Sequence, residues 1–284
     1  MRRISGNLLA LFSVTLALGL GACGETGPGI TVPEPPADLP RAAAGERGDL
    51  PYDVEIGAVG RNARRVYILR PADPQRRDGP VVLFLHGYGS ATVAGYERWL
   101  AHLVRQGATV LFPAYQRRPY GDRRLARESL DNIVSGLPAA LERVRVPEAG
   151  LTVAGVSAGG ALAVDYATSA KALGLPPAKA VYSVYPGRGL PGGAVVVPAA
   201  EGSPPADTEM VAVASPLDAV AGTAWARELL NDAVDVPAGR KRLVIVRDPK
   251  VGAHSAPALT TREARRTFWA PLDRLVFGPD ASGG

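Results

Sequence analysis

Short apolar runs alternate along this chain with longer segments in which apolar side chains recur every three or four positions. Several short runs, such as 80–87, are nearly continuous in apolar residues, which is typical of strands buried on both faces. The turn-like stretch after Val59 predicts that the first two strands pair antiparallel. The pattern predicts eight strands, at 54–59, 64–70, 80–87, 108–115, 151–157, 179–186, 210–215 and 242–248.

The longer segments predict helices, at 96–107, 125–145, 158–174, 221–232 and 260–277. In the first of them Trp99 and Leu103 lie on one apolar face, and Gly107 marks the end of the helix. In the second, Pro138 predicts a kink or a break, because proline removes a backbone donor. Alternation of strands and helices predicts an α/β fold, with a mostly parallel sheet covered by helices on both faces.

The N-terminus has the order of an export signal. Arg2 and Arg3 precede an apolar stretch, Leu8 to Leu20, that is too short to span a bilayer comfortably. The stretch ends in Leu-Gly-Ala-Cys at 20–23, which resembles the lipobox of bacterial lipoproteins. The resemblance implies a signal peptide at 1–22, acylation of Cys23, and a position in the bacterial cell envelope, anchored to a membrane and facing outside the cytoplasm.

A plain secretory signal is the alternative reading of that N-terminus. Cys23 is the only cysteine in the chain, so an exported protein could form no internal disulfide with it, which favours lipidation. Residues 23–50 are rich in proline and glycine and predict an extended tether. Residues 51–284 are long enough for one large core and predict a single domain.

The net charge of the chain does not identify a binding partner. The net charge is +5, and removal of Arg2 and Arg3 lowers it to +3. This small excess, without any recognition motif, gives no support for nucleic-acid binding. The sequence leaves the oligomeric state open.

A serine motif follows the fifth predicted strand. Gly155-Val156-Ser157-Ala158-Gly159 has the form G-x-S-x-G. In α/β-hydrolases this spacing builds a nucleophile elbow, a sharp strand-to-helix turn that exposes the serine hydroxyl, with small neighbours because the backbones nearly touch. Ser157 is therefore the candidate nucleophile.

A serine nucleophile needs a base and an acid, and in this kind of enzyme the chain order is serine, acid and then the histidine base. Of the three histidines, His254 alone follows Ser157, in the loop after the last strand, and is the candidate base. Its alternative is a solvent-exposed loop histidine. His102 lies within the first predicted helix and is interpreted as a packing or surface residue, whereas His86 ends the third strand.

The acid should follow a strand between Ser157 and His254. Asp218 comes directly after the strand at 210–215 and is the favoured acid. Asp248, six residues before His254, is the second candidate, and Asp207 lies in a proline-rich loop. A loop aspartate that caps the next helix is the alternative for each of them.

The developing oxyanion needs backbone donors. One is the N–H of Ala158, directly after the nucleophile. The other is expected in the sequence His-Gly-Tyr-Gly at 86–89, where the backbone of Tyr88 is the candidate donor and His86 has an architectural role.

From about residue 53 to 277 the chain resembles the α/β-hydrolase superfamily, especially compact esterase- and chlorophyllase-like members with a GxSAGG elbow. The resemblance implies an eight-stranded sheet and hydrolysis of a carboxylic ester through an acyl-serine intermediate, with no cofactor and no metal. Val156 stands where histidine is common, and 186–209 forms a Gly/Pro-rich loop in place of a long helical lid.

Other functions use the same residues. Acyl transfer to an alcohol or amine differs only in the exclusion of water, and a peptidase would use the same triad on amides. A non-catalytic, ligand-binding lipoprotein is the alternative from another class. The acyl and alcohol parts of a small-molecule ester substrate, and the membrane that would hold the anchor, stay open.

Overall fold

The computed structural model describes residues 51, 53–90, 92–116, 128–190, 194–195 and 197–281. The expected signal peptide at 1–22 and the tether at 23–50, with Cys23, lie outside the described residues. No helix within the described ranges has the length and apolar character needed to cross a membrane.

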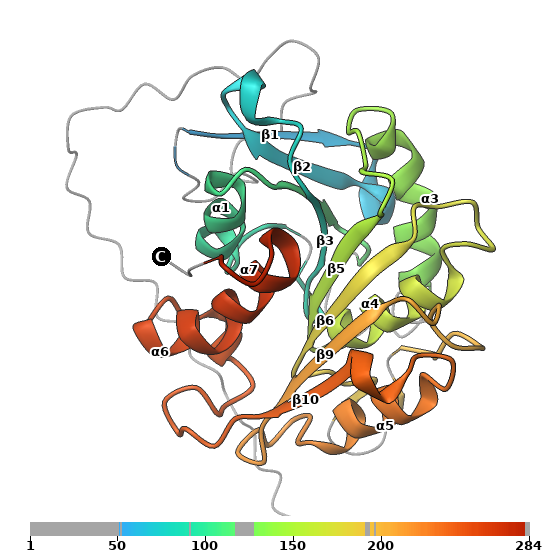
Figure 1. The fold of residues 1–284 in the computed structure, drawn as a ribbon, viewed down its shortest axis with the longest axis vertical. Coiled ribbons are helices and arrows are strands. Elements are labelled where there is room, and N and C mark those ends of the chain that lie inside the picture. The colour runs from blue at the N-terminus through green and yellow to red at the C-terminus, as the bar shows by residue number, and fades with distance from the viewer. Residues whose placement is uncertain are drawn as a thin grey trace, which may run out of the picture. The chain divides into compact units, whose positions relative to one another are not determined.

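Within these ranges, eight strands form one sheet in the order β1-β2-β4-β3-β5-β6-β9-β10. Strands β1 and β2, and β2 and β4, pair antiparallel, and all other neighbours are parallel (Figure 1). All eight strands were expected from the sequence. Their bounds are Val54–Val59 (β1), Val66–Pro71 (β2), Val81–Leu85 (β3), Thr109–Pro113 (β4), Leu151–Val156 (β5), Ala178–Val184 (β6), Glu209–Ala214 (β9) and Lys241–Ile245 (β10).

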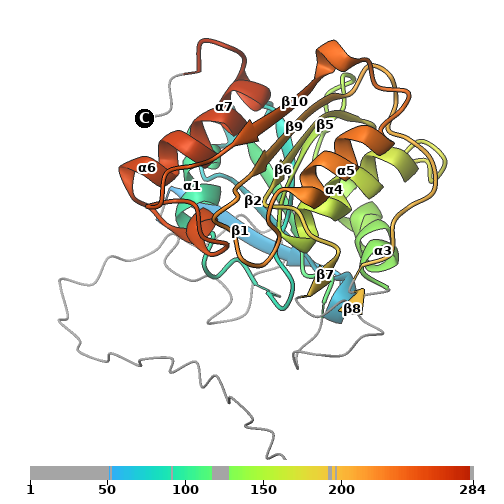
Figure 2. The ribbon, with the colours of Figure 1, turned by 90° about the horizontal axis from the view of Figure 1, so that it is seen from below.

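Helices cover both faces of the sheet, which confirms the predicted α/β-hydrolase architecture (Figures 1 and 2). One face packs against α3 (Ser129–Leu141), α4 (Ala158–Ser169) and α5 (Ala224–Asp232). The other packs against α1 (Glu97–Arg105) and a continuous helical stretch made of α6 (Arg262–Ala264), the π-helix η5 (Arg265–Trp269) and α7 (Ala270–Phe277). Short 3₁₀ turns lie at Asn62–Arg64, Pro74–Arg76, Ala238–Arg240 and Ala256–Ala258.

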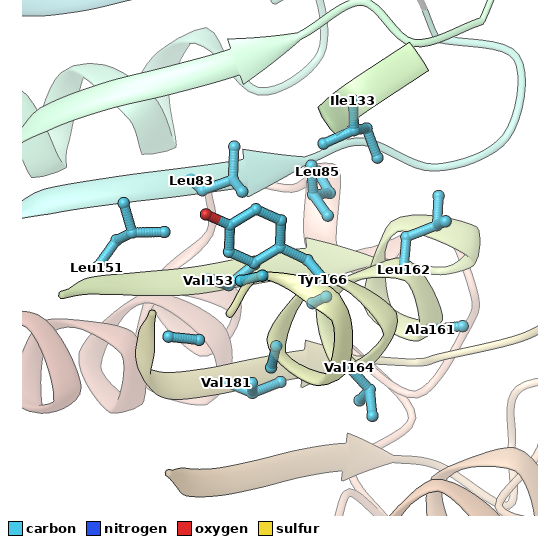
Figure 3. Packing of buried hydrophobic residues seen from close by; sticks show 14 of the residues in the cluster. Leu83, Leu85, Ile133, Leu151, Val153, Ala161, Leu162, Val164, Tyr166 and Val181 are labelled. Carbon is cyan, nitrogen blue, oxygen red and sulfur yellow. The ribbon is translucent and has the colours of Figure 1, made fainter. Parts of the chain in front are cut away.

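The core between the sheet and α4 explains the small and apolar composition of that helix. Tyr166 and Leu162 of α4 belong to one buried apolar cluster with Val153 of the central strand β5, and Figure 3 shows Tyr166 beside Val153. Ten of the twelve residues of α4 are buried, so the helix lies against the sheet with almost its whole surface covered. This packing fixes the N-terminus of α4, where Ser157 stands.

Two sequence expectations need correction. Pro138 does not break its helix: α3 continues to Leu141, and the amide of Glu142 donates to the carbonyl of Pro138 at 3.1 Å. The helix continues past the proline because Ile133 and Leu137 are buried in the core and hold it against the sheet. The expected loop at 186–209 contains a two-stranded antiparallel ribbon, β7 (Gly189–Leu190) and β8 (Ala194–Val195).

Candidate active site

Ser157 stands at a strained turn between β5 and α4. Its φ of 56° and ψ of −122° lie outside the regions that non-glycine residues ordinarily adopt, and strain of this kind clusters at functional sites. The glycines of the motif are required by contact. A Cβ on Gly155 would lie 2.1 Å from the carbonyl oxygen of Gly159, and one on Gly159 would lie 2.1 Å from that of Leu85. The turn therefore has the close backbone packing of a nucleophile elbow.

The structure brings His254 and Asp218 to this serine. His254 Nε2 lies 2.9 Å from Ser157 Oγ, and His254 Nδ1 lies 2.7 Å from Asp218 Oδ2. The Asp218 side chain is fully buried, whereas the histidine side chain is 24% exposed. Because the ionised carboxylate accepts a hydrogen bond from Nδ1–H, Nε2 carries no proton and is free to accept the proton of the serine hydroxyl.

These three residues meet because of the parallel strands. Strands β5, β6, β9 and β10 are neighbours in the sheet, so their carboxyl ends lie along one edge. Ser157 follows β5, Asp218 follows β9 and His254 lies in the loop after β10. The edge of an open α/β sheet at the carboxyl ends of its strands is the usual place for a functional site.

Hydrogen bonds keep Asp218 ionised. Burial acts to raise the pKa of this carboxyl group, but the hydrogen bonds from His254 and from the amides of Ala221 and Val220 outweigh it and lower the pKa below its usual value. The two amides bond Asp218 Oδ1 at 3.1 and 2.8 Å, which leaves Oδ2 for the histidine.

The second acid candidate lies elsewhere. Asp248 is exposed, and its Oδ1 accepts a hydrogen bond from the amide of Lys250 at 2.9 Å. Asp207 is also exposed, in the loop before β9. The structure therefore pairs His254 with Asp218, the acid favoured from the sequence.

The loop at 86–90 lies beside the serine. A Cβ on Gly87 would lie 3.5 Å from Ser157 Cβ, so this loop reaches the elbow directly. The amide of Gly87 donates to Tyr96 Oη at 3.2 Å, and that of Gly89 donates to Gln116 Oε1 at 2.7 Å. Tyr88 stands between these two anchored amides.

Ala158 is the first residue of α4, and an amide at that position has no acceptor within its own helix. Both expected oxyanion donors, the backbone amides of Tyr88 and Ala158, thus lie on segments that border Ser157, and their role stays a prediction.

His86 stabilises the loop at 86–90 through buried contacts. Its ring is fully buried, stacks on Tyr115 with centroids 4.0 Å apart, and donates from Nδ1 to the carbonyl of Gly87 at 2.7 Å. Burial lowers the pKa of His86 to about 4, against the opposing effect of the Gly87 hydrogen bond. The Tyr115 hydroxyl also donates to the carbonyl of His86. These contacts agree with the architectural role expected from the sequence.

Two further contacts stabilise the site, and the sequence alone did not predict either of them. Tyr185 adopts a positive φ of 47° and donates from its hydroxyl to the carbonyl of Val251 at 2.5 Å, three residues before His254. Arg188 forms two hydrogen bonds with the buried Asp165 of α4, at 2.7 and 2.6 Å, and ties the segment after β6 to the helix behind the elbow. Both contacts join residues far apart in the chain, which no local pattern reveals.

Among the described ranges, no cluster of three or more His, Cys, Asp or Glu side chains has the arrangement needed to hold a metal ion.

The order and direction of the strands are those of an α/β-hydrolase. A family model described as alpha/beta hydrolase fold (Abhydrolase_3) matches residues 82–236, more than half of the chain, and the protein belongs to this family. The matched range includes Ser157 and Asp218 and ends before His254. No curated protein matches the sequence.

Solved structures share the fold at low identity. Esterase B from Lactobacillus Rhamnosis is 18% identical with a TM-score of 0.56, over 80% of this chain and 85% of that one. Carboxyl esterase 2 from the mycorrhizal fungus Tuber melanosporum is 17% identical with a TM-score of 0.54, over 76% and 82%. TT1662 from Thermus thermophilus is 17% identical with a TM-score of 0.54, over 79% and 100%.

Proposed function

We propose that this protein is a serine hydrolase that cleaves carboxylic esters through an acyl-serine intermediate. The observation that carries the proposal is the pair of contacts made by His254, 2.9 Å to Ser157 Oγ and 2.7 Å to Asp218 Oδ2. A hydroxyl, an imidazole and a buried carboxylate in this order are what general-base activation of a serine requires.

The chemistry follows from that order. Ser157 Oγ attacks the ester carbonyl carbon while His254 Nε2 takes the hydroxyl proton, and Asp218 stabilises the resulting imidazolium. The carbonyl oxygen becomes an oxyanion, for which the amides of Tyr88 and Ala158 are the proposed donors, each worth about 3 kcal/mol of transition-state stabilisation. The imidazolium returns its proton to the departing alcohol. A water molecule then repeats the sequence on the acyl-serine and releases the acid.

The similarity to proteins named as esterases supports an ester as the substrate. Turnover of 4-nitrophenyl butyrate by the full-length protein tests the proposal. Replacement of Ser157 by Ala should lower turnover by about 10⁶-fold, because the nucleophile acts together with its base. Added methanol should divert only a minor part of the acyl group if water is the natural acceptor. Unchanged turnover in Ser157→Ala would rule out an acyl-serine route.

We also propose that the domain works outside the cytoplasm on a lipid anchor at Cys23. The order of basic, apolar and Leu-Gly-Ala-Cys segments at the N-terminus supports this. Expressed in a bacterial host, the wild type should fractionate with membranes and carry the mass of acyl chains on the mature N-terminus. Cys23→Ala should lose the acyl mass and either leave the membrane fraction or remain unprocessed, and an unchanged mass and fractionation would refute the anchor.

A further inference from the structure

Two adjoining clefts open between α1 and the helical stretch α6–η5–α7, elements that lie side by side in Figures 1 and 2. The larger has a volume of about 500 Å³ and the smaller about 260 Å³. They share His102, Arg265 and Trp269 in their linings, so we treat them as one site, the arginine cleft. The larger volume is within the range of sites that hold small organic molecules.

The described residues that line the arginine cleft include five arginines and no acidic residue. The arginines are Arg98, Arg105, Arg262, Arg265 and Arg266. Of these five arginines, only Arg105 forms an ion pair with a carboxylate of the described residues, that of Asp53 at 2.9 Å, and that pair is exposed. Clustered guanidinium groups repel one another, and an anion in the cleft would remove that repulsion.

His102, which lines both parts of the cleft, is held in place by buried side chains. His102 Nε2 lies 2.8 Å from Asp273 Oδ2, and Gln106 donates to Asp273 Oδ1 at 3.1 Å. Asp273 is fully buried and does not line the cleft. The guanidinium of Arg265 lies over the Trp269 ring, 4.7 Å from its centroid, which orients this arginine before any ligand arrives.

The backbone at this place is itself unusual. Arg265, Arg266 and Trp269 belong to the π-helix η5, inserted between the α-helical segments α6 and α7. Such insertions are rare in proteins and occur frequently at functional sites. The π-helix therefore points to a function of the cleft independently of its charge.

We propose that the arginine cleft binds a phosphate ester. A phosphate group offers several oxygens to planar guanidinium forks and matches clustered arginines better than a single carboxylate does. The volume of the cleft is larger than an inorganic phosphate ion would fill. We therefore place an organic part of the ligand along Trp269 and Ala270. Ser157, Asp218 and His254 are not among the lining residues, so the site is separate from the proposed ester chemistry.

The phosphate ester has two possible sources, a soluble metabolite or the headgroup of an anionic phospholipid. Calorimetric titration with glycerol 3-phosphate tests the first. Co-sedimentation with vesicles of phosphatidylglycerol and phosphatidylcholine tests the second, compared with pure phosphatidylcholine. Both use the full-length chain carrying Cys23→Ala, so that no acyl anchor inserts into the vesicles.

Variants assign binding to the cleft. Arg262→Gln with Arg266→Gln removes two exposed guanidinium groups and should weaken binding at least tenfold. Arg227→Gln with Arg242→Gln makes the same charge change at exposed positions on α5 and β10, and should leave affinity within twofold. Circular dichroism checks that each variant is folded. Arg98→Gln, on α1, provides a second test if the first pair fails to fold.

Each outcome decides the proposal. Binding of glycerol 3-phosphate that the cleft variant loses supports a soluble ligand, and vesicle binding that it loses supports a lipid headgroup. If wild type binds neither probe, or if the cleft and control variants weaken binding equally, the cleft is not a phosphate site. None of these readouts depends on Ser157, so they stand or fall apart from the proposed hydrolase.

Discussion

Within the described residues, histidine and aspartate pair in two places, and the two pairs differ in what surrounds the imidazole. His254 and Asp218 join at 2.7 Å, and His102 and Asp273 join at 2.8 Å. His254 also contacts the hydroxyl of Ser157, whereas His102 contacts the amide of Gln106, which is not a nucleophile. Similar acid–imidazole geometry therefore serves different purposes on one molecule.

The difference lies in the elements that hold each pair. His254 comes from a loop at the carboxyl edge of the sheet, beside a serine on a strained turn. His102 lies inside α1, and its bond to Asp273 of α7 joins two helices of one layer. A carboxylate orients an imidazole in either setting, but only the first setting gives it a proton to take from a nucleophile.

The largest expected effect separates Asp218 from the other acids. Asp218→Asn should lower turnover by about 10⁴-fold, because an amide in this position no longer stabilises the imidazolium or fixes its tautomer. Asp248→Asn, the matched control, should stay within about twofold, since Asp248 bonds Lys250 and not His254. Steady-state kinetics on both variants gives the answer, and a reversed result would reassign the acid.

The third histidine, His86, extends the comparison to an imidazole that, among the described residues, bonds a backbone carbonyl and no acid. Burial lowers the pKa of His86 from 6.5 to about 4, so the folded state favours the neutral ring. Its contribution to stability is complete above pH 6.5 and is lost as pH falls towards 4, by about 3 kcal/mol.

Urea unfolding at several pH values measures this contribution. His86→Phe keeps a ring against Tyr115 but cannot titrate, so its unfolding free energy should fall less steeply than that of wild type between pH 6.5 and 4. Parallel curves for the two proteins would mean that His86 is not the titrating group.

Asp273 is expected to act on stability alone. Asp273→Asn should lower the free energy of unfolding by about 2 kcal/mol, because a buried acceptor of hydrogen bonds from His102 and Gln106 is changed. Turnover per folded molecule should remain within about twofold. A loss of turnover as large as that of Asp218→Asn, in a folded protein, would remove the distinction between the two pairs.

Much of the fold could be predicted from the sequence, because each buried strand carries its own apolar run. The meeting of Ser157, Asp218 and His254 could be predicted for a related reason. All three follow parallel strands, and such strands end at one edge of the sheet. Their catalytic roles remain predictions, as do those of Tyr88 and Ala158.

Other features could not be predicted, because they depend on contacts between distant segments. The arginine cleft combines residues of α1 with residues of η5 that are about 160 positions later, and neither segment alone indicates a site. The bond from Tyr185 to Val251 and the pair of Arg188 with Asp165 have the same character. A break at Pro138 did not occur, because the burial of Ile133 and Leu137 depends on packing against the sheet.

The most direct test of the central claim, an activated serine at the elbow, is intact-mass labelling of the folded protein with a fluorophosphonate. This reagent reacts with an activated serine whatever the natural substrate. Wild type should gain the mass of one adduct, and Ser157→Ala should gain none. A folded wild-type protein that stays unlabelled, or an equal adduct on Ser157→Ala, would contradict the account.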